Sequence, residues 1–316
     1  MSLAQLDLGY TSPLAMTEQE ARTLTASQRK ARLDNLIAES KGLLAEAIAS
    51  HITDEGKQVA AVVALFSGGN DSTTLAHLFR TQATHAAHAN TTIGIERTRQ
   101  YVRDTCASWG LPLLERTPPN DRDHYRALVL DQGFPGPGHH FKMFQRLKER
   151  ALRQVARELN PSPRTHRTVF IAGRRRQESQ RRANVPDMER RGSVVWVSPL
   201  VNWTKVDMNT YRLHYDVPVN EVSDLIHMSG ECLCGSFASP GERAEVGYWF
   251  PDAFAEVAEL EGLLADRDDI PPHRRVWGWG SDPGNKGLRD AEPSRVGALC
   301  SSCDDRFQPA LFEAGA

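Results

Sequence analysis

Short apolar runs alternate with stretches of helical spacing along much of the chain. The expected strands lie at 61–66, 85–90, 113–114 and 169–171. The first is followed by Leu75, Leu78 and Phe79 at helical spacing, and a further helix is expected over 95–109. An alternation of buried strands with helices is typical of a parallel sheet that helices cover. We therefore expect an α/β fold, a doubly wound parallel sheet, over residues 51–225.

Residues 1–50 are expected to form an arm and an amphipathic helix. Residues 1–16 show no periodicity, whereas Thr17 to Glu20 have the pattern of a capping box at a helix start. Apolar positions between Leu33 and Ile48 then follow one helical face. This face is expected to pack on the sheet or on a partner subunit, which leaves a homodimer open.

The first apolar run is followed by the loop Ser67-Gly68-Gly69-Asn70-Asp71-Ser72. A strand, a glycine turn and a helix in succession aim backbone N–H groups and the positive helix end at an anion. The two glycines lack the Cβ that would keep a phosphate away from the backbone. The two serines add hydroxyl donors, and Asp71 is suited to hold a magnesium ion that accompanies the phosphate. The loop therefore predicts a phosphate-binding site.

This loop resembles the Ser-Gly-Gly-x-Asp-Ser loop of the PP-loop ATP pyrophosphatases. That superfamily includes phosphoadenylyl-sulfate (PAPS) reductases, tRNA thiolases and DNA phosphorothioation enzymes. The loop differs from the Gly-Lys-Ser/Thr nucleotide loop because it contains no lysine. The resemblance implies an adenine nucleotide as ligand, with the β- and γ-phosphates of ATP on the loop and Mg²⁺ on Asp71.

Three further segments resemble the PAPS reductase-like branch, in the same order along the chain. The segment from Asn90 to Thr98 implies that Asn90 and Gly94 border the adenosine. A Gly-x-Arg-x-x-Glu-Ser-x-x-Arg pattern follows the strand at 169–171, and it is matched by Gly173, Arg175, Glu178, Ser179 and Arg182. Arginine forks suit phosphate oxygens, so Arg175 is expected near the α-phosphate, with Gly173 and Arg182 also at the nucleotide. In the third segment, 198–208, Thr204 is expected to cap a helix.

Seven arginines lie between residues 174 and 191. Such a patch could hold the backbone of DNA or tRNA as well as a nucleotide phosphate. No aromatic residues are interleaved with these arginines, so the nucleic-acid interpretation stands beside that of an ordinary solvated basic turn.

Four of the five cysteines form two close pairs, Cys232 with Cys234 and Cys300 with Cys303. Four thiolates at this spacing can bind one tetrahedral metal ion or one iron–sulfur cluster. We expect a C-terminal cysteine-ligated subdomain over 226–316, with a 4Fe-4S cluster favoured by the superfamily context and Zn²⁺ as the alternative. The fifth, Cys106, is expected to be a buried structural thiol.

Composition narrows the setting of the protein. The formal net charge of −2 excludes a globally basic nucleic-acid coat. No apolar run is long enough to cross a membrane, and the N-terminus lacks the pattern of a secretory signal. A cytoplasmic protein without a membrane partner is therefore expected, and its cysteines are expected to be ligands or free thiols.

These features favour an ATP-dependent adenylating enzyme that releases pyrophosphate and activates an acceptor for sulfur insertion. Asp71 and Arg175 would be its catalytic residues, the acceptor would be a nucleic acid or nucleotide-like molecule, and a sulfur-donor protein would be a partner. The first alternative is a PAPS or adenylyl-sulfate reductase. The chain has His139-His140 where related reductases place a cluster-binding cysteine pair, and its C-terminus lacks their Glu-Cys-Gly tail. The second alternative is a non-catalytic accessory subunit that binds nucleotide or nucleic acid.

Overall fold

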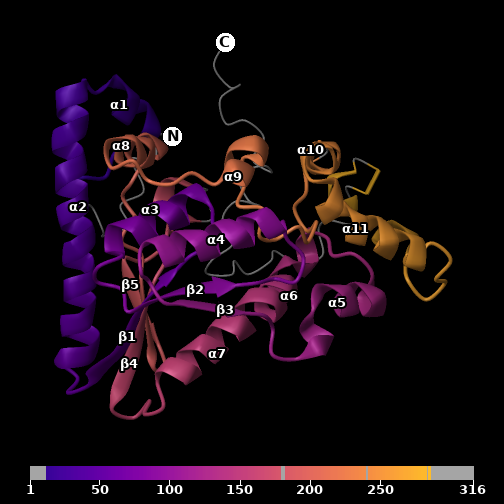
Figure 1. Ribbon diagram of the computed structural model, residues 1–316, viewed down its shortest axis with the longest axis horizontal. Helices are drawn as coiled ribbons and strands as arrows, with labels where there is room; N and C mark the ends of the chain where they lie inside the picture. The colour runs from indigo at the N-terminus through magenta and orange to yellow at the C-terminus, as the bar shows by residue number, and fades with distance from the viewer. Residues whose placement is uncertain (1–11, 179–181, 240, 283, 286–316) are drawn as a thin grey trace. The chain divides into compact units, whose positions relative to one another are not determined.

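The computed structural model describes residues 12–178, 182–239, 241–282 and 284–285. Within them, a six-stranded sheet has the order β3-β2-β1-β4-β6-β5 (Figure 1). Its strands are β1 (Gln58–Leu65), β2 (His85–Ala89), β3 (Leu113–Arg116), β4 (His166–Ile171), β5 (Met188–Arg191) and β6 (Val194–Val197). The expected α/β class is confirmed.

The sheet is mostly, not entirely, parallel. β4 pairs in parallel with β1 and with β6, whereas β5 runs antiparallel to β6. The expectation of a purely parallel sheet is therefore corrected at one edge. The two edge residues Arg190 and Arg191 belong to this antiparallel strand, which is polar and carries no apolar run that would have predicted it.

Helices connect and cover the strands. They are α1 (Glu18–Thr23), α2 (Ala26–Ile48), α3 (Asn70–Phe79), α4 (Glu96–Ser108), α5 (Tyr125–Gln132), α6 (His140–Phe144), α7 (Arg150–Leu159), α8 (Lys205–His214), α9 (Glu221–Ile226), α10 (Glu242–Trp249) and α11 (Pro251–Leu264). Among the residues that the structure describes, no helix combines the length and apolar character that a bilayer crossing requires.

The chain divides into two compact units, each built from separate stretches of sequence. Unit 1 combines 1–66, 70–86 and 159–218, and unit 2 combines 67–69, 87–158 and 219–316. The domain boundaries expected after residues 50 and 225 stay predictions.

Unit 1 contains the N-terminal helices and most of the sheet. The capping box at Thr17 begins α1, and a second one at Thr25 begins α2, the long indigo helix of Figure 1. α2 packs against β6 and α8. Arg32 of α2 donates two hydrogen bonds to Asp207 of α8, at 2.9 and 3.0 Å, and both side chains are buried. Asp207 also completes the expected cap of Thr204.

Unit 2 has its own hydrophobic core, formed by α5, α11 and the segments around them. Tyr125, Phe134, Leu233, Val257 and Trp277 are among its buried members. The indole N–H of Trp277 donates to the carbonyl oxygen of Leu233 at 2.8 Å. Cys106 on α4 is also buried, and burial raises the pKa of its thiol to about 12. That agrees with the expected structural role.

Candidate nucleotide-binding site

The phosphate loop continues directly into α3 in unit 1. The helix begins at Asn70, so Asn70, Asp71 and Ser72 form its first turn. The helical spacing of Leu75, Leu78 and Phe79 had predicted this helix without its first turn. Backbone N–H groups in the first turn of a helix have no partner within the helix, and the helix dipole makes this end positive. The three residues are therefore at the position where an anion is favoured.

Asp71 and Arg175 meet at the end of β4. Arg175 Nε donates to Asp71 Oδ2 at 2.7 Å, and the arginine is 8% exposed. Gly173 makes this approach close, because a Cβ at its position would lie 3.2 Å from the carbonyl carbon of Asp71 and 3.3 Å from the amide nitrogen of Ser72. Two residues predicted to be catalytic thus form one ion pair within unit 1.

The arginines of 174–191 are largely balanced by carboxylates. Every ion pair of this stretch that the structure gives stays within unit 1, and the pairs are Arg174–Glu189, Arg175–Asp71, Arg176–Asp187, Arg182–Glu178, Arg190–Glu55 and Arg191–Glu189. Paired cations attract a nucleic-acid backbone less than free ones do. Ser179 and Arg181 lie outside the described residues.

Gly68 in unit 2 has a backbone that only glycine adopts easily. Its φ is +79°, and a Cβ there would lie 2.7 Å from Cγ2 of Thr98. Its carbonyl oxygen accepts hydrogen bonds from Asn220 Nδ2 at 2.9 Å and from Ser223 Oγ at 3.3 Å. The carbonyl group of the turn is therefore fixed by Ser223 of α9 and by Asn220, the residue directly before α9. Gly69 lies next to Ser229. A Cβ added to Gly69 would lie 3.2 Å from the Cβ of that serine.

Asn90 and Gly94 have structural partners in unit 2. Asn90 Nδ2 donates to Glu115 Oε1 at 2.8 Å, and its Oδ1 accepts from the backbone of Thr92. A Cβ on Gly94 would lie 2.4 Å from the carbonyl oxygen of Glu231. Gly94 thus allows the segment around Glu231 to pack directly against it. The role of both residues at an adenosine stays a prediction.

Glu231 is the centre of a buried ionic cluster in unit 2. Its carboxylate lies 2.9 Å from His88 Nε2 and 3.4 Å from Arg99 Nε, and it accepts the backbone N–H of Thr91 at 2.8 Å. Burial alone would raise the pKa of Glu231, but His88, Arg99 and the Thr91 N–H together hold it below its ordinary value. The cluster joins the segment after β2 to the cysteine segment.

Cys232 and Cys234 follow Glu231 directly. Cys234 is buried and Cys232 is half-buried, and within the described part of the chain both are free cysteines. A hydrogen bond with Cys232 and burial raise the pKa of Cys234 well above its ordinary value. The described residues contain no group of three or more His, Cys, Asp or Glu side chains arranged for a metal. Cys300 and Cys303, the other expected ligands, lie outside the described residues.

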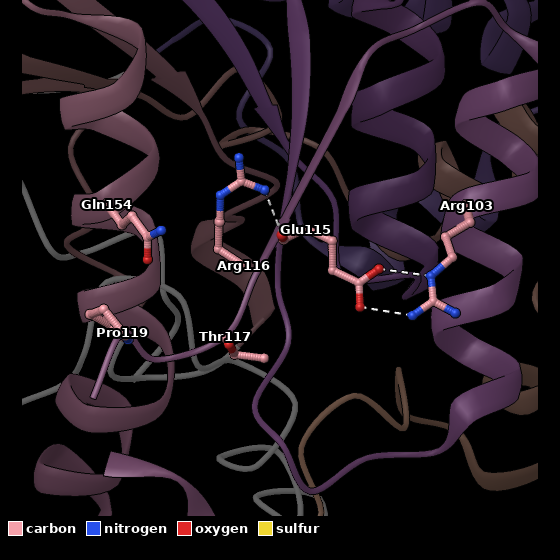
Figure 2. Close-up of a pocket in the computed structure, with 6 residues that line it drawn as sticks. All are labelled: Arg103, Glu115, Arg116, Thr117, Pro119 and Gln154. Atoms are coloured by element: carbon pink, nitrogen blue, oxygen red, sulfur yellow. Dashed lines mark hydrogen bonds and ion pairs between the residues drawn. The ribbon is translucent and has the colours of Figure 1, made fainter. Parts of the chain in front are cut away.

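A polar cavity of about 550 Å³ lies at the carboxyl end of β3 in unit 2. Figure 2 shows Glu115 turned toward Arg103, whose guanidinium binds both carboxylate oxygens, at 2.8 and 2.9 Å. Arg116 on the same wall pairs with Glu158 at 2.7 Å. Both arginines of this cavity are therefore paired with carboxylates. It contains none of the residues predicted for the nucleotide.

A family model, the phosphoadenosine phosphosulfate reductase domain, matches residues 61–228. The chain belongs to this family. The match begins at the strand that leads into the phosphate loop and includes α9. The predicted PAPS reductase-like resemblance is confirmed.

Relatives of this PAPS reductase family member are named as sulfonucleotide reductases. An adenosine 5′-phosphosulfate reductase of Shouchella clausii (strain KSM-K16) is 34% identical over 103 residues, which are 32% of this chain and 41% of that protein. Another, of Chelativorans sp. (strain BNC1), is 25% identical over 247 residues, which are 77% of this chain and 94% of that protein. The first match therefore spans less than half of the relative. A crystal structure of the PAPS reductase of Candida auris in a phosphate complex is similar at 14% identity and a TM-score of 0.44, over 64% of this chain and 93% of that one.

Several residues that organise the site were not predicted from the sequence. Asn220 and Ser223 hold Gly68, and Glu231 with Arg99 fixes the cysteine segment. Their partners are far away along the chain, and none belongs to a short pattern. The one local signal was the position of Glu231 directly before Cys232.

Proposed function

We propose that the chain is an ATP-dependent adenylating enzyme that releases pyrophosphate and activates an acceptor for sulfur insertion. The observation that carries this proposal is the first turn of α3, in which Asp71 is bonded to Arg175. Family membership supports the nucleotide chemistry. The acceptor would be a nucleic acid or a nucleotide-like molecule.

The residues of the loop would act on the phosphates of ATP. Backbone N–H groups of the glycine turn and of the helix start would bind the β- and γ-phosphates, together with the hydroxyls of Ser67 and Ser72. Arg175 would stabilise negative charge that develops at the α-phosphate when the acceptor oxygen attacks it. The acceptor oxygen would then carry AMP as leaving group, and a sulfur nucleophile from a donor protein would displace AMP.

Asp71 fits a magnesium ion as its single protein carboxylate. Mg²⁺ in phosphoryl-transfer sites is commonly held by one or two carboxylates together with the substrate phosphates. Asp71 is 24% exposed in its side chain, so one of its oxygens can reach a ligand, while Arg175 binds the other. The ion would neutralise charge on the phosphates of ATP.

The cysteines are proposed to bind a 4Fe-4S cluster, with Zn²⁺ as the alternative. Cys232 and Cys234 supply two adjacent thiols on a segment that Glu231 fixes. The donor set is soft, which suits iron–sulfur clusters and zinc. Cys300 and Cys303 are the proposed remaining ligands. Such a group would supply sulfur or redox chemistry, or would have the structural role of holding the two cysteine pairs together.

Asp71→Asn tests the catalytic assignment. The substitution keeps size and removes the charge, so we expect pyrophosphate release from ATP to fall at least ~100-fold. The protein should still fold, with a lower melting temperature because the buried Arg175 loses its charged bond to Asp71. Asp34→Asn is the control, because Asp34 lies on α2 in an exposed pair with Lys30. Pyrophosphate release that is equal in the two variants would contradict the role of Asp71.

A sulfonucleotide reductase is the second candidate, and the names of the relatives favour it. That reaction needs a thiol that attacks the sulfate sulfur. Sulfite release from PAPS or adenosine 5′-phosphosulfate with thioredoxin, without any pyrophosphate release from ATP, would select it. Nucleotide binding without release of sulfite or pyrophosphate would instead indicate an accessory subunit. Salt-sensitive binding of DNA or tRNA would support the same interpretation.

A further inference from the structure

The helical segment 140–158 of unit 2 carries an excess of positive charge. Its six lysines and arginines and its two glutamates are Lys142, Arg146, Lys148, Glu149, Arg150, Arg153, Arg157 and Glu158. α6 and α7 form this segment together with a π-helical turn between them, Gln145–Glu149. Single π-helical turns are uncommon, and they often lie at functional sites. An exposed basic segment of this kind is a candidate surface for a polyanion.

The carboxylates near this segment neutralise only part of its charge. Arg146 and Arg150 both bind the buried carboxylate of Asp123. Arg153 binds Glu149, four residues before it. Two carboxylates thus serve three arginines, whose side chains are 38%, 38% and 58% exposed. The arginines therefore keep an excess of positive charge that solvent can reach.

α7 separates its charged positions from its apolar ones. Its buried residues are Ala151, Leu152 and Val155. Arg150, Gln154 and Arg157 follow one another at spacings of four and three residues, so they lie on one face of the helix. A basic helix that lies on a membrane keeps an apolar face for the lipid. Because the apolar positions of α7 are buried in the protein, its arginines suit a polyanion in water and not a lipid surface.

The cavity at the carboxyl end of β3 lies beside this face of α7. Gln154, which stands between Arg150 and Arg157 on the helix, is one of the residues that line the cavity. Figure 2 shows Gln154 and Arg103 on different helices, at the two sides of Arg116. The volume of about 550 Å³ is in the range of small-molecule sites. A row of arginines and a cavity are thus neighbours within unit 2.

Arg116 offers this cavity the plane of its guanidinium group. Its Nε and Nη2 donate to Glu158, at 3.1 and 2.7 Å, and its Nη1 donates to the carbonyl oxygen of Glu115 at 2.8 Å. A guanidinium whose edges are held in this way can still stack on a planar ring. Gln154 and Thr117 add an amide and a hydroxyl to the lining. A planar nitrogen heterocycle, such as a nucleobase, suits these groups better than a phosphate does.

We propose that this surface binds a single strand of nucleic acid, with its phosphates on Arg150, Arg153 and Arg157 and one base in the cavity. Arginine forks bind phosphate oxygens, and bases stack on guanidinium planes. The strand is single because the bases of a duplex are paired and stacked, and an unstacked base alone can enter a cavity. Such a strand would be the acceptor of the proposed function, on which this assignment rests.

The first test removes two exposed charges from α7. The variant carries Arg153→Gln and Arg157→Gln. Its control carries Arg243→Gln and Arg267→Gln, which remove the same charge from exposed arginines elsewhere in unit 2. Fluorescence anisotropy measures the affinity for a labelled single strand of about 12 nucleotides, as DNA and as RNA, from about 50 to about 200 mM NaCl.

We expect the α7 variant to bind the strand about 10-fold more weakly, with a salt slope smaller by about 1.4, and the control to bind it as the unaltered protein does. An equal loss of affinity in the two variants would overturn the surface, because the strand would then sense only the net charge.

Gln154→Trp tests the cavity, because the larger side chain fills the space that a base would occupy. Gln100→Trp on α4 is the control, since Gln100 is exposed in the same unit and does not line the cavity. The strand carries 2-aminopurine, whose fluorescence rises when the base is unstacked. We expect Gln154→Trp to bind about 10-fold more weakly at an unchanged salt slope and without the rise in fluorescence. Equal affinities of the two tryptophan variants would overturn the base-binding cavity.

Photo-crosslinking of the unaltered protein covers the case in which a variant does not fold. A strand that carries 4-thiouracil should crosslink to peptides that contain residues 116–119 or 150–157. Crosslinks only to 174–191 would overturn the surface. Binding of poly-glutamate or of phosphatidylserine vesicles as tight as that of the strand would also overturn it, because the site would then recognise negative charge alone.

Strand binding is measured without ATP, which separates it from the proposed reaction. Binding that persists in a protein that releases no pyrophosphate keeps the surface and rejects the reaction. Pyrophosphate release with a small nucleotide-like acceptor, without any strand binding, keeps the reaction and overturns the surface.

Discussion

Gly68 is held in a conformation that other residues adopt only with strain. Replacing it by alanine adds the strain of a positive φ to a contact of 2.7 Å with Thr98, so we expect a loss of about 2–4 kcal/mol in the free energy of unfolding. Gly110→Ala is the matched control, since Gly110 has a φ of +62° with nothing within 4 Å of its Cβ position. It should lose only about 1–2 kcal/mol. Urea unfolding measures the free energy of unfolding of both variants. Equal losses would mean that Thr98 moves aside at no cost in free energy.

Glu231 predicts a specific pH dependence. Its pKa is lowered from 4.5 in the folded protein, so its charge stabilises the fold at neutral pH and this contribution is lost as pH falls below about 4.5 through the folded pKa. Glu231→Gln keeps the shape but leaves Arg99 and His88 without the carboxylate, and we expect a loss of about 3 kcal/mol at pH 7. The difference in the free energy of unfolding from the unaltered protein should narrow as pH falls below about 4.5.

Denaturant unfolding at several pH values measures this difference. Glu259→Gln is the control, because Glu259 forms an exposed pair with Arg126 and should change stability little. A Glu231→Gln deficit that stays constant down to pH 3 would show that the carboxylate charge is not what stabilises the cluster.

At the scale of the elements, α2 and α8 are joined by a buried ion pair. Arg32→Met leaves Asp207 buried with only its capping bonds to Thr204, and we expect a loss of about 3 kcal/mol. Lys30→Met, which removes the exposed partner of Asp34 on the same helix, should stay within about 0.5 kcal/mol. Urea midpoints at equal m-values compare them. Similar losses in the free energy of unfolding for the two variants would mean that the packing of the helix face, and not the ion pair, stabilises the contact.

The elements that the sequence predicted are those with a local physical signature. The buried strands, the helix after the loop and the cap at Thr204 were predicted from apolar runs and capping residues, and the structure has them. β5 was missed, since Met188 to Arg191 pairs as a polar edge strand and polar edges carry no apolar alternation. The helix start at Thr17 was predicted, but the break between α1 and α2 was not, because the capping box at Thr25 was not recognised.

Long-range polar contacts could not be predicted in this way. Glu231 meets His88 across 143 positions of sequence, and Asn220 meets Gly68 across 152. Such pairs depend on how the chain folds back on itself, which periodicity does not report. The candidate loop was therefore recognisable as a pattern, whereas the residues that hold it were visible only in the structure.

At the scale of the whole molecule, the proposed catalytic pair and the proposed metal ligands fall in different compact units. Asp71 and Arg175 belong to unit 1, whereas Cys232 and Cys234 belong to unit 2. Loss of the metal group and loss of phosphate chemistry should therefore be separable by mutation. The anaerobic absorption spectrum, with iron and zinc quantified on the same sample, identifies the group. About four irons per chain and a broad visible band indicate the cluster. One zinc per chain without colour indicates a structural zinc site.

Cys232→Ser then tests the ligand assignment. Serine is a poor ligand for soft metals, so we expect the metal content per chain to fall several-fold. Cys106→Ala is the control within the same unit, since Cys106 is a buried thiol of α4 that is expected to bind nothing. Asp71→Asn should keep the full metal content while losing pyrophosphate release. Metal content that survives Cys232→Ser, or that falls equally in the Cys106 variant, would remove the cysteine pair from the metal site and leave the proposed function to Asp71 and Arg175.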